Sequence, residues 1–323
     1  MQREPDTAAR RALTPLEEAP PGLAPGRRLL LKREDLHELG AFKWRGALPT
    51  LERYASEGAS TVVTASTGNQ GAATAWAAQR LGLRAIVYAP EGATRAKVEL
   101  IESLGAEARL IGADFDEAKA EAEAAAKVEG LLFVDGDEPE QYEGYRAIGD
   151  EILDQADEFF PTTHPRTGSP PVAAVVVPVG NGALLGGIAL AVCDRSPETL
   201  RIGVVPKDAP VMALSWEAGE VVESASSATI ADGLAVRVAI PLAVAVLGEV
   251  ASRMVLVSER AIARAIQSYA ETGIRAEGAA AAALAAVPQL DDVPDPLVLV
   301  VTGRNIDDDL FKRACDAPET FPE

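Results

Sequence analysis

The sequence predicts an α/β protein with two open parallel-sheet domains, each with helices on both faces of its sheet. Short apolar runs typical of buried strands alternate with longer stretches of helical periodicity. The turns between them are short, and neighbouring parallel strands need helix-length crossovers of this kind. A proline-rich stretch at residues 160–171 interrupts the alternation, which then begins again. We therefore expect a small domain of residues 47–147 and a large domain of residues 1–46 and 148–323, with a cleft between them at the carboxyl ends of the strands.

The expected elements follow the apolar pattern in order. Residues 1–27 are rich in proline and arginine and are expected to be irregular, whereas residues 28–33 are expected to form a strand. The first alternating series has expected strands at 61–64, 84–89, 107–111 and 131–134, and expected helices at 43–57, 69–81, 94–104 and 115–127. After a long expected helix at 141–158, the second series has expected strands at 172–177, 201–205, 254–257 and 297–301, and expected helices at 184–193, 259–269 and 277–286.

The composition excludes several classes of function. The chain has 323 residues, 48% of them hydrophobic, which is ample for a buried core. Its net charge of −19 opposes binding to nucleic acid or to an anionic membrane. The two cysteines and two histidines lack the spacing of metal ligands, so we expect no metal site. No apolar run reaches the ~18 residues of a membrane span, and the first residues lack an apolar signal region, so we expect a cytoplasmic protein.

Lys43 is the first candidate for a reactive group. It lies between Phe42 and Trp44, ahead of the first expected helix. A lysine that is partly desolvated by apolar neighbours gives up its proton more easily, and its free amine can attack a carbonyl group. Most lysines are solvated surface residues, so this position alone does not identify a reactive amine.

A polar turn follows the strand expected at 61–64. It contains Ser66, Thr67, Gly68, Asn69 and Gln70, and a helix is expected to begin within it. Free backbone N–H groups and the helix dipole favour an anion at such a turn, and the polar side chains add hydrogen-bonding groups. The turn therefore suits a carboxylate or a ring oxygen, although a helix start that binds no ligand has the same pattern.

A glycine-rich turn follows the strand expected at 172–177. Its residues are Gly180, Asn181, Gly182, Ala183 and Leu184. Small residues allow the backbone to approach an anion closely at a helix start, and a phosphate group is the usual ligand.

Thr302 follows the last expected strand and places a neutral hydroxyl at its carboxyl end. A hydroxyl that faces a pyridine nitrogen would not hold that nitrogen protonated as a carboxylate would.

Six segments match one family in the order in which that family carries them. They are FKWRGA at 42–47, STGNQG at 66–71, GNGA at 180–183, ADGLAV at 231–236, EGAA at 277–280 and TGRNID at 302–307. Together they resemble the fold type II pyridoxal-phosphate enzymes, the tryptophan synthase β-like group, and within it the threonine/serine dehydratases. The matches span most of the chain, so they are more specific than any one motif.

The resemblance implies pyridoxal 5'-phosphate as cofactor and a role for each candidate residue. Lys43 would bind the cofactor covalently and then act as catalytic base. Asn69 would bond the 3′-oxygen of the cofactor, and the loop 66–70 would hold the substrate carboxylate, with Ser66 as a candidate proton donor to the leaving hydroxyl. Residues 180–184 would bind the phosphate, and Thr302 would face the ring nitrogen. The implied reaction converts threonine or serine to a 2-oxo acid and ammonia, and the implied assembly is a homodimer.

The sequence departs from the family pattern at several of these positions. Asn181 and Ala183 replace glycines of the phosphate loop. Thr302 replaces a serine or cysteine, as in threonine synthases, and Gln70 replaces a histidine of many dehydratases. Thr67 stands where racemases of the family have a catalytic serine, which weakens a racemase hypothesis.

Three alternatives stay open at this point. One is a β- or γ-replacement enzyme of the same fold, similar to threonine synthase or cysteine synthase. A second is a nicotinamide oxidoreductase, because Gly180, Gly182 and Gly186 with Asp208 resemble a dinucleotide-binding loop and its ribose-binding acid. A third is a cofactor-binding or interaction protein without activity, against which the intact Lys43 argues.

Overall fold

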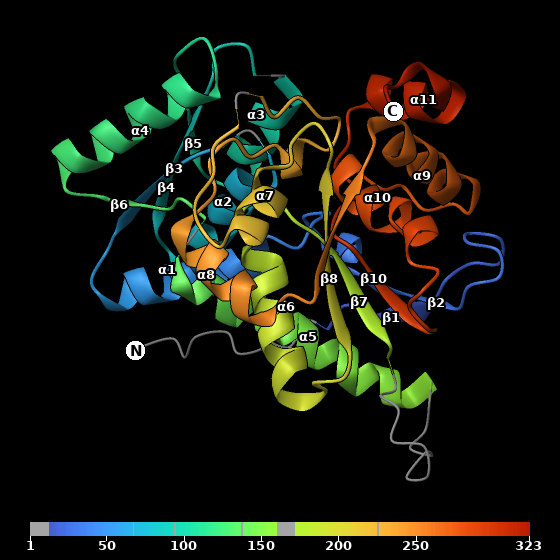
Figure 1. Ribbon diagram of the computed structural model, residues 1–323. Coiled ribbons are helices and arrows are strands. Elements are labelled where there is room, and N and C mark those ends of the chain that lie inside the picture. Colours follow the sequence, from blue (N-terminus) through green and yellow to red (C-terminus); the bar gives the residue numbers. More distant parts are fainter. Residues whose placement is uncertain (1–12, 67, 94, 137, 160–171, 225) are drawn as a thin grey trace. The chain divides into compact units, whose positions relative to one another are not determined.

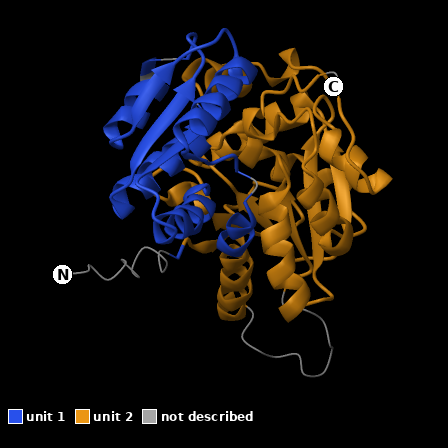
Figure 2. Cartoon of the chain, turned by 90° about the vertical axis from the view of Figure 1, so that its left-hand side faces the viewer, with its two compact units in different colours: residues 1–13, 42–144 blue, residues 14–41, 145–323 orange. Residues whose placement is uncertain are grey.

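The computed structural model describes residues 13–66, 68–93, 95–136, 138–159, 172–224 and 226–323. The chain forms two compact units (Figure 2). Phe42–Gly144 form the body of unit 1, and Thr14–Ala41 with Tyr145–Glu323 form unit 2. Lys43 and the polar turn at 66–71 therefore belong to unit 1, whereas the glycine-rich turn at 180–184 and Thr302 belong to unit 2.

Unit 1 contains a four-stranded sheet in the order β5-β4-β3-β6 (Figure 1). Its strands are β3 (Thr61–Ala65), β4 (Arg84–Ala89), β5 (Glu107–Leu110) and β6 (Leu132–Phe133). The helices between and before them are α1 (Trp44–Ser56), α2 (Asn69–Leu81), α3 (Arg95–Ser103) and α4 (Phe115–Glu129). Every strand pair is parallel, as the sequence predicted.

Helices cover both faces of this sheet. On one face, Val63 and Ile86 pack against Ala122 of α4. On the other face, α2 comes so close to β4 that a Cβ on Gly71 would lie 3.2 Å from the Val87 side chain. The alternation of side chains along a strand sends neighbouring residues to opposite faces, which explains why every residue of β3 and β4 after the first is buried.

Unit 2 contains a six-stranded sheet in the order β1-β2-β10-β7-β8-β9 (Figure 1). Its strands are β1 (Leu16–Glu18), β2 (Leu29–Arg33), β7 (Ala174–Pro178), β8 (Leu200–Pro206), β9 (Arg253–Val257) and β10 (Leu297–Val301). The longer helices in or entering this unit are α5 (Pro139–Phe159), α6 (Ala183–Arg195), α7 (Val211–Ala218), α8 (Pro241–Val250), α9 (Glu259–Glu271), α10 (Gly278–Ala285) and α11 (Asp308–Asp316).

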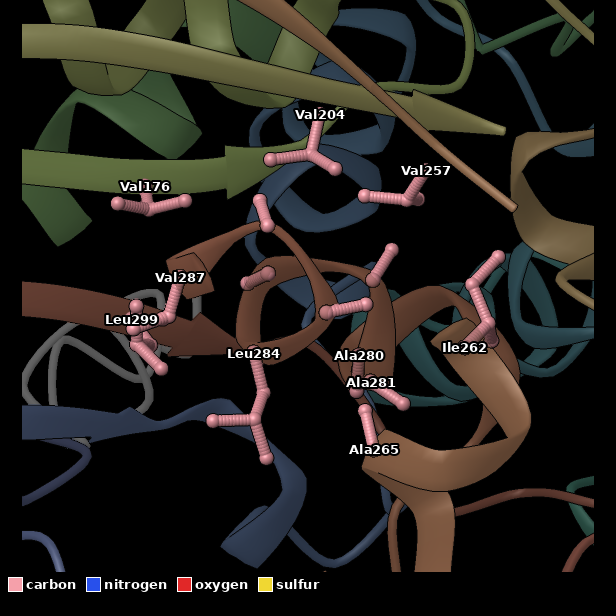
Figure 3. Close-up of a cluster of buried hydrophobic side chains, with 14 of the residues drawn as sticks. Val176, Val204, Val257, Ile262, Ala265, Ala280, Ala281, Leu284, Val287 and Leu299 are labelled. Carbon is pink, nitrogen blue, oxygen red and sulfur yellow. The ribbon is translucent and has the colours of Figure 1, made fainter. Parts of the chain in front are cut away.

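The main core of unit 2 lies between this sheet and helices α9 and α10. Figure 3 shows Val176, Val204 and Leu299 of the sheet facing the buried residues of α10, among them Ala280 and Leu284. Every residue of α10 is buried. A helix that is apolar all round belongs inside a core, and its alanines let it pack closely against the strands.

The opposite face of this sheet is covered by α6 and α5. A Cβ on Gly203 of β8 would lie 2.9 Å from Leu185 of α6. Lys32 of β2 is fully buried on this face, and its Nζ lies 2.6 Å from a carboxylate oxygen of Glu151 in α5. The strand at 29–33 therefore contains a charge that the apolar pattern did not explain.

The structure corrects two expectations. β1 lies within residues 1–27, which were expected to be irregular, and it pairs antiparallel with β2, Leu16 opposite Lys32. The sheet is therefore mixed, because strands joined by a short link can pair only as antiparallel neighbours. Helices α7 and α8 were not predicted. The apolar run of α8 has no 3.6-residue period that could separate helix from strand.

No helix among the described residues combines the length and the apolar character that crossing a membrane requires.

Candidate active site

Lys43 lies directly before α1, where buried neighbours fix the backbone. The carbonyl of Lys43 accepts a hydrogen bond from Ala47 N at 3.0 Å, so the residue caps the helix. Trp44 is buried and packs edge-to-face on Trp76 of α2, with ring centroids 5.9 Å apart. The Lys43 side chain is partly exposed, and its Nζ lies 5.3 Å from the centre of the Phe42 ring. The capping hydrogen bond and the packing of Trp44 thus hold the backbone of Lys43 at the start of α1.

The polar turn of unit 1 is tightly folded at the carboxyl end of β3. Ser66 is buried, and its Oγ accepts a hydrogen bond from Gly68 N at 3.1 Å. A Cβ on Gly71 would lie 2.6 Å from the Ser66 carbonyl oxygen, so only glycine fits there. Asn69 begins α2 and is partly exposed. Thr67 lies outside the described residues.

Gln70, in the first turn of α2, has a buried side-chain amide. Its Nε2 and Oε1 atoms have no hydrogen-bond partner among the described residues. A buried amide without partners costs folding free energy, so such groups normally find a protein, water or ligand partner. This unpaired amide is consistent with a turn that binds a polar ligand.

The glycine-rich turn of unit 2 connects β7 to α6. A Cβ on Gly180 would lie 2.5 Å from the carbonyl oxygen of Gly233, and Gly182 has a φ of 96° that favours glycine. The turn therefore depends on two of its small residues. It precedes a helix of 13 residues, whose N-terminus favours an anion.

Asn181 replaces a glycine in this turn without disturbing it. Its Oδ1 accepts a hydrogen bond from Ala183 N at 3.2 Å. The asparagine thus pairs with one of the N–H groups that a phosphate would also use. Leu184, the last residue of the predicted phosphate loop, is a buried residue of α6.

Thr302 lies at the carboxyl end of β10 and is 2% exposed. Its Oγ1 has no hydrogen-bond partner among the described residues. The neighbouring Gly303 packs on the buried Glu277, because a Cβ there would lie 2.6 Å from Oε1 of that carboxylate. A second link joins the same residues, since Glu277 N donates to Gly303 O at 3.0 Å.

These residues of unit 2 fit pyridoxal 5'-phosphate. The turn at 180–184 offers a close backbone approach and a helix N-terminus to the phosphate group. The unpaired hydroxyl of Thr302 offers a hydrogen bond to a ring nitrogen.

One support of the glycine-rich turn was not singled out from the sequence. Gly233 belongs to the ADGLAV segment, but only the structure shows that its carbonyl supports Gly180. Asp232 is exposed and accepts a hydrogen bond from Gly233 N at 2.9 Å, which is the turn-forming role that a short acidic side chain often has.

Comparison with known proteins identifies the family. The family described as pyridoxal-phosphate dependent enzymes matches residues 10–303. The L-threonine ammonia-lyase of Geobacter sulfurreducens is 36% identical over 284 residues, which are 86% of this chain and 67% of that protein. The L-threonine ammonia-lyase of Thermotoga maritima is 34% identical over 295 residues, 89% of this chain and 70% of that protein.

A solved structure agrees with these relatives. The processed form of threonine deaminase isoform 2 from Solanum lycopersicum superimposes with a TM-score of 0.85 at 31% identity, covering 93% of this chain and 86% of that chain. The family match replaces the nicotinamide hypothesis, and the expected cofactor is confirmed. The chain belongs to the pyridoxal-phosphate dependent enzymes, the fold type II group that its six ordered segments predicted.

Proposed function

We propose that this protein is an ammonia-lyase that removes the β-hydroxyl of threonine or serine and yields a 2-oxo acid and ammonia. The relatives named L-threonine ammonia-lyase support the substrate class, because each matches more than four-fifths of this chain. The buried hydroxyl of Thr302, which has no hydrogen-bond partner among the described residues, is the structural observation that supports the cofactor chemistry most directly. A neutral partner leaves a ring nitrogen largely unprotonated, which favours prompt elimination over a long-lived delocalised charge.

Residues from four of the segments identified in the sequence are proposed to bind the cofactor. Lys43 binds it covalently, and Asn69 donates to its 3′-oxygen. Residues 180–184 bind its phosphate through backbone N–H groups at the start of α6. Thr302 donates its hydroxyl hydrogen to the ring nitrogen. When bound, pyridoxal 5'-phosphate supplies the electron sink for the bond pair that Cα of the substrate releases.

The polar turn and Lys43 are proposed to act on the substrate. Residues 66–70 hold the substrate carboxylate through backbone N–H groups and polar side chains, and this fixes the Cα hydrogen for transfer to the Lys43 amine. Ser66 Oγ accepts a hydrogen bond from Gly68 N, which leaves the hydroxyl hydrogen of Ser66 for donation to the leaving β-hydroxyl. The product released from the site takes up water and loses ammonia.

The test is the formation of 2-oxo acid and ammonia from L-threonine and L-serine by the purified holoprotein. Replacement of Lys43 by Ala should abolish both turnover and the visible absorbance band of the bound cofactor. Replacement of the exposed Lys127 by Ala, in the last turn of α4, serves as the matched control and should leave both unchanged. Full activity in the Lys43 variant would contradict the proposal. Product that forms only with an added thiol or other nucleophile would favour the replacement enzyme instead.

The protein is further proposed to be a cytoplasmic homodimer that binds small amino acids and neither nucleic acid nor membranes. The net charge of −19 supports the last point, because it repels polyanions and anionic lipid. The dimer follows from the family resemblance, and light scattering of the purified protein tests it.

A further inference from the structure

Glu259 is a buried acidic residue that no sequence motif singled out. It is the first residue of α9 and is 4% exposed. Its Oε2 accepts a hydrogen bond from Ile230 N at 2.7 Å, and the Thr229 hydroxyl also donates to this carboxylate. Its Oε1 is buried without a hydrogen-bond partner among the described residues. The side chain thus ties the start of α9 to the segment 229–230.

The carboxylate is not explained by stability alone. Burial raises the pKa of Glu259 and the charge of Asp208 adds to this, whereas the hydrogen bonds from Ile230 and Thr229 lower it. A buried carboxylate with one unpaired oxygen costs folding free energy, and an apolar side chain would fill the same space without that cost. The carboxylate forms two hydrogen bonds to the segment 229–230, which an apolar side chain could not form.

This segment is held firmly on its other side by α10. A Cβ on Gly278 would lie 2.5 Å from the carbonyl oxygen of Ile230 and 2.9 Å from Cα of Ala231. Ala231 is fully buried, and its N–H donates to the Thr229 hydroxyl oxygen at 3.0 Å. The chain at 229–231 is therefore fixed between the first residues of two helices.

The same segment continues directly to the predicted phosphate loop. After Ala231 the chain forms a short 3-10 turn, Asp232–Leu234. Leu234 N donates to Ala231 O at 2.7 Å, which couples the turn to the fixed segment. Within this turn, the carbonyl oxygen of Gly233 lies close to Gly180: a Cβ added to Gly180 would be 2.5 Å from it. A displacement of 229–231 would therefore reach the backbone of Gly180.

We infer that Glu259 is a positioning residue for the phosphate-binding turn at 180–184, acting through the segment 229–234. The inference rests on the proposed role of that turn. Glu259 touches neither cofactor nor substrate in this scheme. It holds Gly233 against Gly180, so that the N–H groups at the start of α6 keep the spacing that a phosphate group needs.

Three variants of the 323-residue protein separate this role from a general loss of stability. Glu259→Ala removes both hydrogen bonds to the segment 229–230. Glu259→Gln keeps a carbonyl oxygen that can accept the Ile230 N–H. Ser258→Ala is the matched control, because it removes the cap of the same helix, where Ser258 Oγ accepts from Ala261 N at 3.2 Å, without touching the segment 229–234.

The readout is the affinity of the cofactor-free protein for pyridoxal 5'-phosphate and for pyridoxal, which lacks the phosphate group. Glu259→Ala should raise the Kd for pyridoxal 5'-phosphate on the order of tenfold, and leave the Kd for pyridoxal unchanged, because only the phosphate contact is disturbed. Glu259→Gln should restore most of the affinity, and Ser258→Ala should change neither Kd.

Two results would overturn the inference while leaving the proposed function intact. One is an equal loss of affinity for both ligands in Glu259→Ala. The other is the same phosphate-specific loss in Ser258→Ala, which would assign the effect to the stability of α9. A wild-type protein that fails to bind pyridoxal 5'-phosphate would instead overturn the proposed function, and the inference with it.

Discussion

Gly144 of α5 lies directly against the backbone of Arg45: a Cβ at Gly144 would be 1.9 Å from the Arg45 carbonyl oxygen and 3.2 Å from Gly46 N. The peptide that it touches belongs to the first turn of α1. Gly46 N and Ala47 N both donate to the carbonyl of Lys43, at 3.2 and 3.0 Å. The absence of a side chain at Gly144 therefore lets α5 support the turn that carries Lys43.

Replacement of Gly144 by Ala should impair activity, although it adds only one methyl group at a residue that takes no part in the chemistry. The added methyl must push the peptide at 45–46 away, and overpacking of this kind costs about 1–3 kcal/mol. A small displacement of a reacting amine can lower kcat by roughly 100-fold. Steady-state kinetics and thermal unfolding measure both effects.

Gly248→Ala provides the control for this substitution. Gly248 lies in helix α8, and a Cβ there would meet no atom within 4 Å. An alanine should therefore stabilise that helix by about 0.5–1 kcal/mol and leave kcat unchanged. Equal effects of the two substitutions would contradict the role assigned to Gly144.

Local sequence patterns predicted those helices and turns whose start, apolar face and end are all set by residues within one short stretch of the chain. α2 was expected at 69–81 and occupies Asn69–Leu81, because a polar turn precedes its apolar face and Gly82, with a φ of 70°, ends it. The turn at 180–184 was likewise found from its small residues. In each case the signal and the structure lie within one stretch of chain.

Features that depend on contacts distant in sequence were not predicted. Gly144 contacts Arg45, and Gly180 contacts Gly233. The residues of each pair lie too far apart in the sequence for a periodic pattern to indicate the contact. β1 exists because β2 offers it an edge, rather than because Leu16–Glu18 has strong strand propensity. The sequence predicted a helix that begins at Glu259, but only the structure places Ile230 N against its carboxylate.

The buried hydroxyl of Thr302 predicts opposite effects on stability and on cofactor binding. Valine has nearly the same shape without the hydroxyl, so Thr302→Val removes a buried polar atom that has no partner among the described residues. The free energy of unfolding of the cofactor-free protein should rise by about 1 kcal/mol. The Kd for pyridoxal 5'-phosphate should rise, because the hydrogen bond to the ring nitrogen is lost, and Thr302→Ser should preserve it.

Chemical unfolding and cofactor titration of the two variants test this pair of effects. A valine variant that binds the cofactor as tightly as the wild type would show that Thr302 does not contact the ring. Loss of stability in the valine variant would show that the hydroxyl is paired in solution, for example by water.

The buried ion pair between Lys32 and Glu151 predicts that removal of one charge alone lowers the free energy of unfolding strongly. Lys32 Nζ lies 2.6 Å from Glu151 Oε2 and 2.6 Å from the Thr14 carbonyl oxygen, and the Lys32 side chain is fully buried. Glu151→Leu leaves this ammonium without its carboxylate and should cost about 3–5 kcal/mol of unfolding free energy. The double variant Lys32→Met, Glu151→Leu removes both charges and should recover most of that loss.

Urea unfolding of the single and double variants completes the cycle and gives the coupling energy. The exposed pair Arg95–Glu99 is the control: its side chains are 91% and 56% exposed, so Glu99→Ala should change the free energy of unfolding by less than about 0.5 kcal/mol. A double variant as unstable as Glu151→Leu alone would contradict the electrostatic explanation.

The pKa of Tyr54 predicts a loss of stability in alkaline solution. Tyr54 of α1 is 6% exposed, and its Oη lies 3.4 Å from both the Phe133 carbonyl oxygen and a carboxylate oxygen of Glu138. Burial, followed by the charge of Glu138, raises the pKa of Tyr54 from 10.0 to about 12. The folded protein therefore keeps this proton at pH values where the unfolded chain has lost it.

This difference in pKa makes the folded protein less stable as the pH rises. The stabilisation is fully present below about pH 10 and disappears as the pH rises from 10 towards 12, because the unfolded state then binds fewer protons than the folded state. Over that range the wild type should lose on the order of 2 kcal/mol relative to Tyr54→Phe, which cannot ionise. Urea unfolding of both proteins at pH 8, about 10 and about 11.5 tests this, since every other titrating group is common to the two. A difference in stability that stays constant across these pH values would show that Tyr54 ionises normally in the folded protein.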